Sequence, residues 1–122
     1  MTGIDVMDRK PHFSLTRRAG SFVFVSGQLA FDKDMKIVDG GIEAQTRQCV
    51  RNIESALHRE GLTLNDVVKV MVWLSDSDDF WSFNAAYAEH FPDAPPARST
   101  VGSTLMVPGA KIEMEAQAWA GD

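Results

Sequence analysis

The alternation of apolar and polar residues in the first half of the chain predicts two strands followed by a long helix. Short β-branched and aromatic runs at residues 13–17 and 22–26 predict strands, and the four residues between them predict a hairpin. Over residues 42–60 apolar side chains recur at spacings of three and four, which is typical of an amphipathic helix. Gly61 suits the left-handed position that ends such a helix.

The second half predicts a strand, a second helix and a final pair of strands. Residues 67–74 are apolar on both faces, as in a strand that is covered on both sides. Acidic and serine residues then favour the start of a helix over residues 80–91, whose aromatic stripe we interpret as core. Residues 98–105 and 111–119 follow as strands, and Pro108-Gly109 between them predicts a type II turn and therefore a hairpin.

The resulting order, β-β-α-β-α-β-β, predicts one α+β domain over residues 1–122 with a mixed sheet. Two helices can cover only one face of such a sheet, yet the strand at residues 67–74 is apolar on both faces. The second face therefore needs cover from elsewhere, and a partner subunit is the simplest source. We expect a homo-oligomer.

Composition and charge narrow the class of protein. With 122 residues, 44% of them hydrophobic, the chain has the profile of one ordinary globular domain. Its net charge of −5 opposes binding to nucleic acid, for which lysine and arginine supply most of the affinity. No apolar run approaches the length of a membrane span, and the N-terminus carries no apolar signal core, so we expect a cytoplasmic protein.

Several common chemistries find no support in the sequence. The three histidines, His12, His58 and His90, have no metal-ligand spacing, so we expect no metal. Cys49 lies in the apolar stripe of the predicted helix and is expected to be a small buried hydrophobe. Neither glycine-rich phosphate-loop pattern is present.

The last two predicted strands hold the most informative polar residues. Glu113 and Glu115 share one face of the final strand, and antiparallel pairing in the predicted hairpin would set Arg98 and Thr100 opposite that strand. An arginine fixed after a proline-rich loop suits a substrate carboxylate, and a nearby glutamate suits the activation of water. The alternative is a structural Arg–Glu ion pair between strands at a subunit interface.

Four segments together resemble the Rid/YjgF family of reactive intermediate deaminases, also called L-PSP endoribonuclease-like proteins. The resemblance extends from about Phe13 to Trp119, in the same order and at similar spacing, over VSGQL, FWSFNAAYAEHF, PARS and KIEMEA. It implies a chorismate-mutase-like fold and a homotrimer with its sites in the clefts between subunits.

The resemblance also implies a reaction, which is the cofactor-free hydrolysis of imines and enamines to 2-keto acids and ammonia. The chain would then be a hydrolase of the 2-iminobutanoate/2-iminopropanoate deaminase type. Arg98 matches the family arginine that pairs with the substrate carboxylate, and Glu113 matches the acidic residue that positions water. Ser26, Gly27 and Asn84 match motif positions near the site.

Two positions depart from the best-known family members. Phe13 stands where they carry tyrosine, and Thr100 where they carry cysteine. Phe13 keeps the ring without the hydroxyl, which favours a larger or more apolar substrate, and Thr100 keeps a hydroxyl that can orient water. Trp81, Met106 and Trp119 either widen the cleft or are buried in the core or an interface.

Two other functions remain as alternatives. One is a regulatory trimer that binds a small carboxylate without turnover. The other, an endoribonuclease or translation inhibitor, fits the acidic charge poorly, and the separated histidines offer no pair for RNA cleavage.

Overall fold

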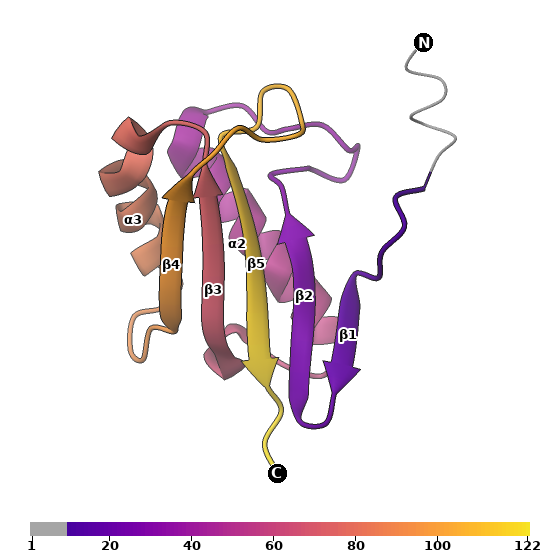
Figure 1. Ribbon diagram of the computed structural model, residues 1–122. Coiled ribbons are helices and arrows are strands. Elements are labelled where there is room, and N and C mark those ends of the chain that lie inside the picture. Colours follow the sequence, from indigo (N-terminus) through magenta and orange to yellow (C-terminus); the bar gives the residue numbers. More distant parts are fainter. Residues whose placement is uncertain (1–9) are drawn as a thin grey trace.

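A five-stranded mixed sheet carries two helices on one face in the computed structural model, which describes residues 10–122 (Figure 1). This confirms the α+β architecture and its order of elements. The elements are β1 (Thr16–Ala19), β2 (Phe22–Gln28), α2 (Gly41–Arg59), η1 (Leu64–Asp66), β3 (Val67–Leu74), η2 (Ser77–Asp79), α3 (Phe80–Ala88), β4 (Ala97–Gly102) and β5 (Ile112–Trp119).

The order of strands in the sheet is β1-β2-β5-β3-β4, so the last strand of the chain is the central one. The predicted hairpin of β1 and β2 is confirmed, although β1 starts three residues later than expected. The predicted hairpin of β4 and β5 is wrong. β4 pairs in parallel with β3, and β5 pairs antiparallel with both β2 and β3.

The turn that suggested this hairpin does exist. Gly109 has φ of +83°, and the Ala110 N–H donates to the Val107 carbonyl at 3.1 Å, as in a type II turn. The chain between β4 and β5 crosses the end of β3 before it enters the sheet, as the loop at the top of Figure 1 shows. The local turn was therefore predicted correctly, and the strand pairing was not.

The core lies between the sheet and α2. Alternate residues of β5 point into it, as do alternate residues of β2 and β3 and the apolar stripe of α2, including Cys49. At the end of this helix Gly61 has φ of +76°, and the Leu62 N–H donates to the Leu57 carbonyl at 3.0 Å. The predicted helix end and the buried cysteine are both confirmed.

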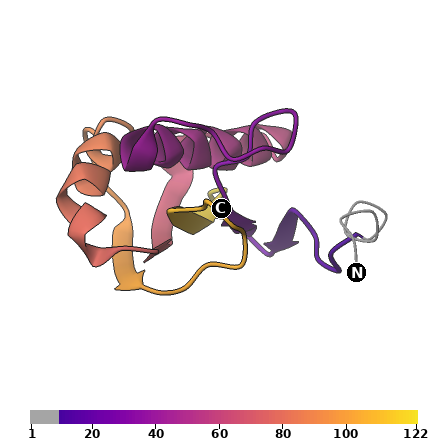
Figure 2. The same cartoon turned by 90° about the horizontal axis from the view of Figure 1, so that it is seen from above.

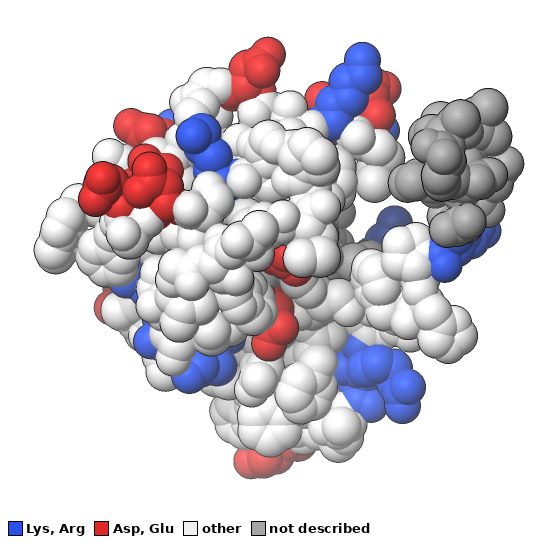
Figure 3. Space-filling view, turned by 45° about the horizontal axis from the view of Figure 1, so that its top comes forward, with Lys and Arg blue, Asp and Glu red and all other residues white. Residues whose placement is uncertain are grey.

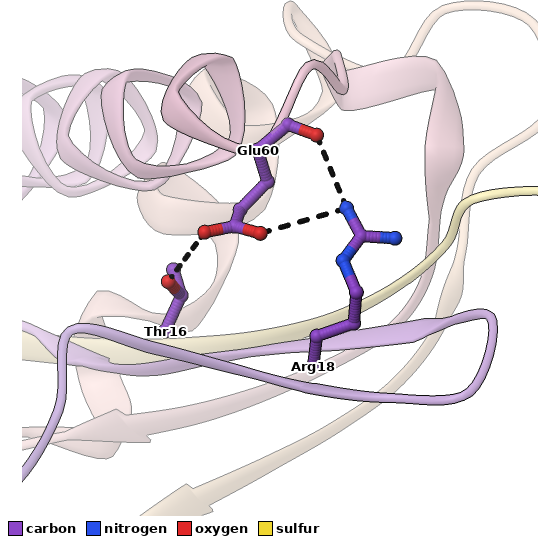
Figure 4. A network of polar contacts seen from close by, with 3 residues as sticks. All are labelled: Thr16, Arg18 and Glu60. Atoms are coloured by element: carbon purple, nitrogen blue, oxygen red, sulfur yellow. Dashed lines mark hydrogen bonds and ion pairs between the residues drawn. The ribbon is translucent and has the colours of Figure 1, made fainter.

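Glu60, at the C-terminal end of α2, ties the helix to the edge strand β1 (Figure 4). Its carboxylate accepts a hydrogen bond from Thr16 Oγ1 at 3.0 Å and approaches Arg18 Nη2 at 3.5 Å. The same Arg18 nitrogen donates to the Glu60 backbone carbonyl at 3.2 Å. One residue thus holds β1 through both its side chain and its backbone.

The opposite face of the sheet carries no helix or strand within the described residues (Figure 2). Phe22, Phe24 and Trp119 are more than 40% exposed on it, at 45%, 42% and 43%. Seen obliquely in the space-filling view, this side is mostly uncharged, with acidic groups near its middle and basic groups at its margin (Figure 3). Residues 10–122 thus cover β3 on one face only, and the expected partner subunit stays a prediction.

Candidate functional site

Arg98, the second residue of β4, lies on the helix-covered face of the sheet, where it is in register with the buried Val70 of β3. The centre of its guanidinium group lies 4.7 Å from the Tyr87 ring centroid, 5.0 Å from that of Phe83 and 5.6 Å from that of Phe80. Distances of this order are favourable cation–π geometry. Three rings on one side of α3 therefore hold the guanidinium group in place.

Asn84 fixes the same guanidinium group from the same helix. Arg98 Nη2 donates a hydrogen bond to Asn84 Oδ1 at 3.0 Å. Thr100 lies two residues further along β4, half-buried and on the same face, in register with Val72. We call Arg98, Asn84, Thr100 and the three rings the Arg98 cluster.

The charge of Arg98 has no anionic partner in the described part of the chain. No carboxylate among residues 10–122 lies within ion-pair distance of it, and its polar partner, Asn84, is neutral. Burial raises the pKa of Tyr87 to about 12, while the neighbouring Arg98 opposes that shift. Tyr87 is therefore uncharged at neutral pH, and the half-buried cation remains available to an external anion.

Glu113 lies on the other face of the sheet, because it is in register with Trp73 of β3 and both alternate with buried neighbours. Its carboxylate lies directly over Gly27, where an added methyl group would collide with Glu113 Oε2. Gly27 belongs to an irregular stretch of β2, where the register with β5 shifts between Val25 and Gln28. The missing side chain at Gly27 is thus what gives the Glu113 carboxylate its space.

The environment of Glu113 favours its protonated form. Partial burial raises the pKa of this carboxyl, and the negative charge of Glu115 two residues along the same face raises it further. Burial also raises the pKa of the Cys49 thiol, and the charge of Glu113 adds to that shift. Glu113 is therefore a stronger base than an exposed glutamate, whereas Cys49 is held as an unreactive thiol.

Ser26 lies on the side of the molecule where Glu113 is found, and Phe13 belongs to the segment that precedes β1. Ser26 Oγ donates to the backbone carbonyl of Ser14 and so attaches the segment before β1 to β2. Ser14 and Ser26 line a hollow of about 230 Å³ with Glu115. Phe13 adjoins Ser14 and is 66% exposed. We call Glu113, Glu115, Gly27 and Ser26 the Glu113 cluster.

The structure does not bring Arg98 and Glu113 together within one chain. The sequence-based expectation set them near each other on paired strands, but β3 separates β4 from β5, and the two side chains point to opposite faces of the sheet. This excludes an Arg98–Glu113 ion pair between adjacent strands of one chain, and the alternative of a structural Arg–Glu pair at a subunit interface stays a prediction. Within one chain the Arg98 cluster and the Glu113 cluster therefore remain separate.

Sequence reasoning missed the aromatic support of Arg98. It assigned the stripe on α3 to the core, and Phe83 and Tyr87 are indeed buried there. The same rings also face the guanidinium group, which follows from the parallel pairing of β4 with β3 beside α3. The available signal was Asn84 within the stripe, since an amide among apolar positions calls for a polar partner.

Three further expectations concern metals, membranes and exposed apolar residues. Among residues 10–122 no three His, Cys, Asp or Glu side chains are grouped so that they could hold a metal ion. No helix in that part of the chain is both long and apolar enough to cross a bilayer. Trp81 and Met106 are 76% and 85% exposed, which excludes both from the core of the chain.

The fold and the two clusters define a small α+β protein with a partly buried glutamate on one face of its sheet and, on the other, an arginine that has no anionic partner among residues 10–122. The sequence matches the family described as Endoribonuclease L-PSP over residues 7–120. The chain belongs to this family, which is the Rid/YjgF family.

Individual relatives agree with this membership. A RutC family protein of Pyrococcus horikoshii is 43% identical over 108 residues, which are 88% of this chain and 86% of the relative. The crystal structure of yeast Mmf1 superposes with a TM-score of 0.86 at 35% identity and covers 93% of this chain and 90% of that one. RidA from an Antarctic Psychrobacter superposes with a TM-score of 0.84 at 33% identity, over 89% of each chain.

Proposed function

We propose that the protein hydrolyses imines and enamines that carry a carboxylate, releasing ammonia and a 2-keto acid. In this proposal Arg98 binds the substrate carboxylate, and Glu113 positions and activates the attacking water. The sites lie between subunits of a homotrimer, and no cofactor takes part. Membership of the Rid family supports a Rid-like function, and the geometry of the two clusters supports these roles.

The observation that carries the proposal is the unpaired charge of Arg98. The guanidinium group is half-buried, rests on three aromatic rings and has a neutral amide as its partner among the described residues. Partial burial of a cation without an anion costs free energy. A bound carboxylate offsets this cost because it forms charge-assisted hydrogen bonds with the guanidinium group. Such a site selects small molecules with one anionic end.

The chemistry needs little more than this anchor and a base. The imine carbon is already electrophilic, so water adds to it while Glu113 accepts a proton from the water. The same carboxyl then returns this proton to nitrogen, which gives a carbinolamine. It next takes the proton of the new hydroxyl group and passes it to nitrogen as the C–N bond breaks, so that the carbonyl forms and ammonia leaves. The raised pKa of Glu113 suits both the acceptance and the return of a proton near neutral pH.

The opposed positions of the two clusters support a site shared by two copies. Arg98 and Glu113 point to opposite faces of the sheet, so the Arg98 cluster of one copy can meet the Glu113 cluster of its neighbour. The uncovered sheet face, with three exposed aromatic residues, supplies apolar surface for such contacts. Three copies around one axis would form three equivalent sites.

Substitution of Arg98 tests the proposal. Imines are generated in situ by an amino-acid oxidase, and keto-acid formation is followed with and without the protein. We expect Arg98→Ala to lower kcat/KM about a hundredfold and Arg98→Lys to recover only part of this, because lysine has no planar fork. Arg59→Ala, which removes an exposed arginine of α2, serves as the control and should keep full activity.

Two results would contradict the proposal. If no imine from several amino acids is hydrolysed faster with the protein, the catalytic role fails. If 2-keto acids nevertheless raise its melting temperature, the protein is a carboxylate-binding trimer without turnover. RNA cleavage that disappears in both Arg98→Ala and Glu113→Gln would instead support the activity in the family's name.

A cytoplasmic location completes the proposal. One relative, the yeast protein MMF1, is named as mitochondrial, so the family is not confined to one compartment. Fractionation of cells that express the protein, with blotting of each fraction, tests this point directly.

A further inference from the structure

Trp81 is an exposed aromatic residue beside the Arg98 cluster. Its side chain lies in the first turn of α3 and is 76% exposed. The indole meets the Phe80 ring edge-on, with centroids 4.9 Å apart and planes at 83°. Phe80 is itself one of the rings that face Arg98, at 5.6 Å. A single ring therefore separates the indole from the guanidinium group.

The helix places Trp81 on the outward side of the Arg98 cluster. Trp81 precedes Asn84 by three residues, and residues at this spacing lie one above the other on a helix. Asn84 bonds to Arg98, while Phe83 and Tyr87 close the inward side because they are buried. A molecule whose carboxylate binds Arg98 must extend away from these buried rings, and the exposed indole of Trp81 lies beside Phe80 on that outward side.

We propose that Trp81 forms the subsite for the substrate's side chain and selects substrates whose side chain is aromatic or branched aliphatic. This inference rests on the proposed function, since it takes Arg98 as the carboxylate anchor. An exposed indole gains most from a ligand ring because such contacts bury apolar area and allow edge or offset stacking. A substrate with only a methyl group would gain little from it.

Calorimetric titration with two 2-keto acids, pyruvate and phenylpyruvate, tests the selection without need of turnover. We expect Trp81→Ala to weaken phenylpyruvate binding about tenfold and to change pyruvate binding less than twofold. Trp81→Phe should recover most of the phenylpyruvate affinity. Met35→Ala removes another exposed apolar side chain, in the loop before α2, and should change neither affinity.

Each other outcome overturns the inference. Equal losses for both keto acids would show that Trp81 supports the anchor and not selection, and unchanged affinities would show that the indole touches no ligand. A Trp81→Ala protein that dissociates at concentrations where the parent stays assembled would place the indole in a subunit contact. The absence of binding by either keto acid to the parent would overturn the Arg98 anchor as well.

The proposed function can fail separately from this inference. If phenylpyruvate binds more tightly than pyruvate and Trp81→Ala abolishes the difference, the subsite stands even where no imine is hydrolysed. If imines are hydrolysed but those from alanine and phenylalanine respond equally to Trp81→Ala, the reaction stands and the subsite falls.

Discussion

The Arg98 cluster and the Glu113 cluster hold opposite charges in place by opposite means. Arg98 is held by direct contacts, because three aromatic rings and one amide of α3 pack against its guanidinium group. Glu113 depends instead on the absence of a side chain at Gly27, because its carboxylate occupies the space that such a side chain would fill. The first cluster binds its charged group tightly, whereas the second leaves room for it.

This difference shows how one small sheet can keep two opposite charges available. Within a chain they lie on opposite faces, so they cannot neutralise each other. Glu113 has another carboxylate nearby instead of a cation, which favours proton acceptance, and Arg98 has no anion among the described residues. Both charges thereby remain available to an external ligand, as the proposed site between two copies requires.

The strongest test of the comparison is complementation between two inactive variants. Arg98→Ala and Glu113→Gln should each lose about a hundredfold in kcat/KM. If each site takes Arg98 from one copy and Glu113 from the next, mixing the unfolded variants and refolding them together should restore about a quarter of the parental activity. The measurement is imine hydrolysis per chain, compared with each variant refolded alone.

A mixture no more active than its components would contradict the shared site. It would mean that both residues act from the same chain or that one of them is not required. Refolding Arg98→Ala with Arg59→Ala is the matched control, because this mixture supplies intact Glu113 throughout and intact Arg98 from half its chains.

Filling the space at Gly27 tests the Glu113 cluster alone. Gly27→Ala should displace the Glu113 carboxylate and lower kcat about tenfold or more, with little change in KM if the carboxylate of the substrate still binds Arg98. Gly102→Ala is the matched control, since a methyl group there would meet its nearest neighbour, the Leu74 carbonyl oxygen, at 4.0 Å. Steady-state kinetics of both variants against the parent provides the measurement.

A Gly27→Ala enzyme with parental kcat would show that the position of this carboxylate is unimportant. The pH profile adds a readout that loss of fold would not imitate. A displaced Glu113 that gains access to water should show a lower kinetic pKa on the acid limb, because the burial that raises its pKa is reduced.

The smallest expected effect is on stability. Since the pKa of Glu113 is raised in the fold, ionisation favours the unfolded chain, and stability falls as the pH rises from the unfolded pKa through the folded one. Glu113→Gln should therefore be more stable than the parent at neutral pH, by roughly 0.5 kcal/mol or less because water screens a partly exposed group. Urea unfolding at pH 7 and at about pH 3.5 measures the difference, which should vanish at the lower pH.

Glu43→Gln, on the exposed side of α2, is the control and should show no comparable gain. A Glu113→Gln protein less stable than the parent at pH 7 would mean that the carboxylate makes a favourable interaction in the fold. The description of the Glu113 cluster as open space would then be wrong.

Local patterns predicted the elements well because each depends on neighbours in the chain. Residues 67–74 were expected as a strand and are β3, and Gly61 ends α2 as its left-handed preference requires. The predicted pairing of β4 with β5 was wrong because a turn motif specifies that the chain reverses direction. It does not specify which strands then pair with each other. The polar sequence of β4 suits an edge strand, whereas β5, with one fully buried face, suits the centre.

The candidate site was predicted as a set of residues and not as an arrangement. Arg98 and Glu113 were chosen for their chemistry and family position, but the face to which each points follows from register, which distant pairing decides. The position of the Glu113 carboxylate over Gly27 depends on a register shift in β2, and no short sequence motif specifies that shift. The roles of these residues remain predictions until the variants are measured.

The central position of β5 has a consequence for how the protein is made. Until this strand is synthesised, β1–β2 and β3–β4 are two separate ribbons with no backbone hydrogen bonds to join them. A ribosome must therefore release the residues of β5 from its exit tunnel before the sheet can close, and the nascent chain waits with its apolar faces unpaired. Closure of the sheet is thus a late step in folding, because it depends on the last strand of the chain.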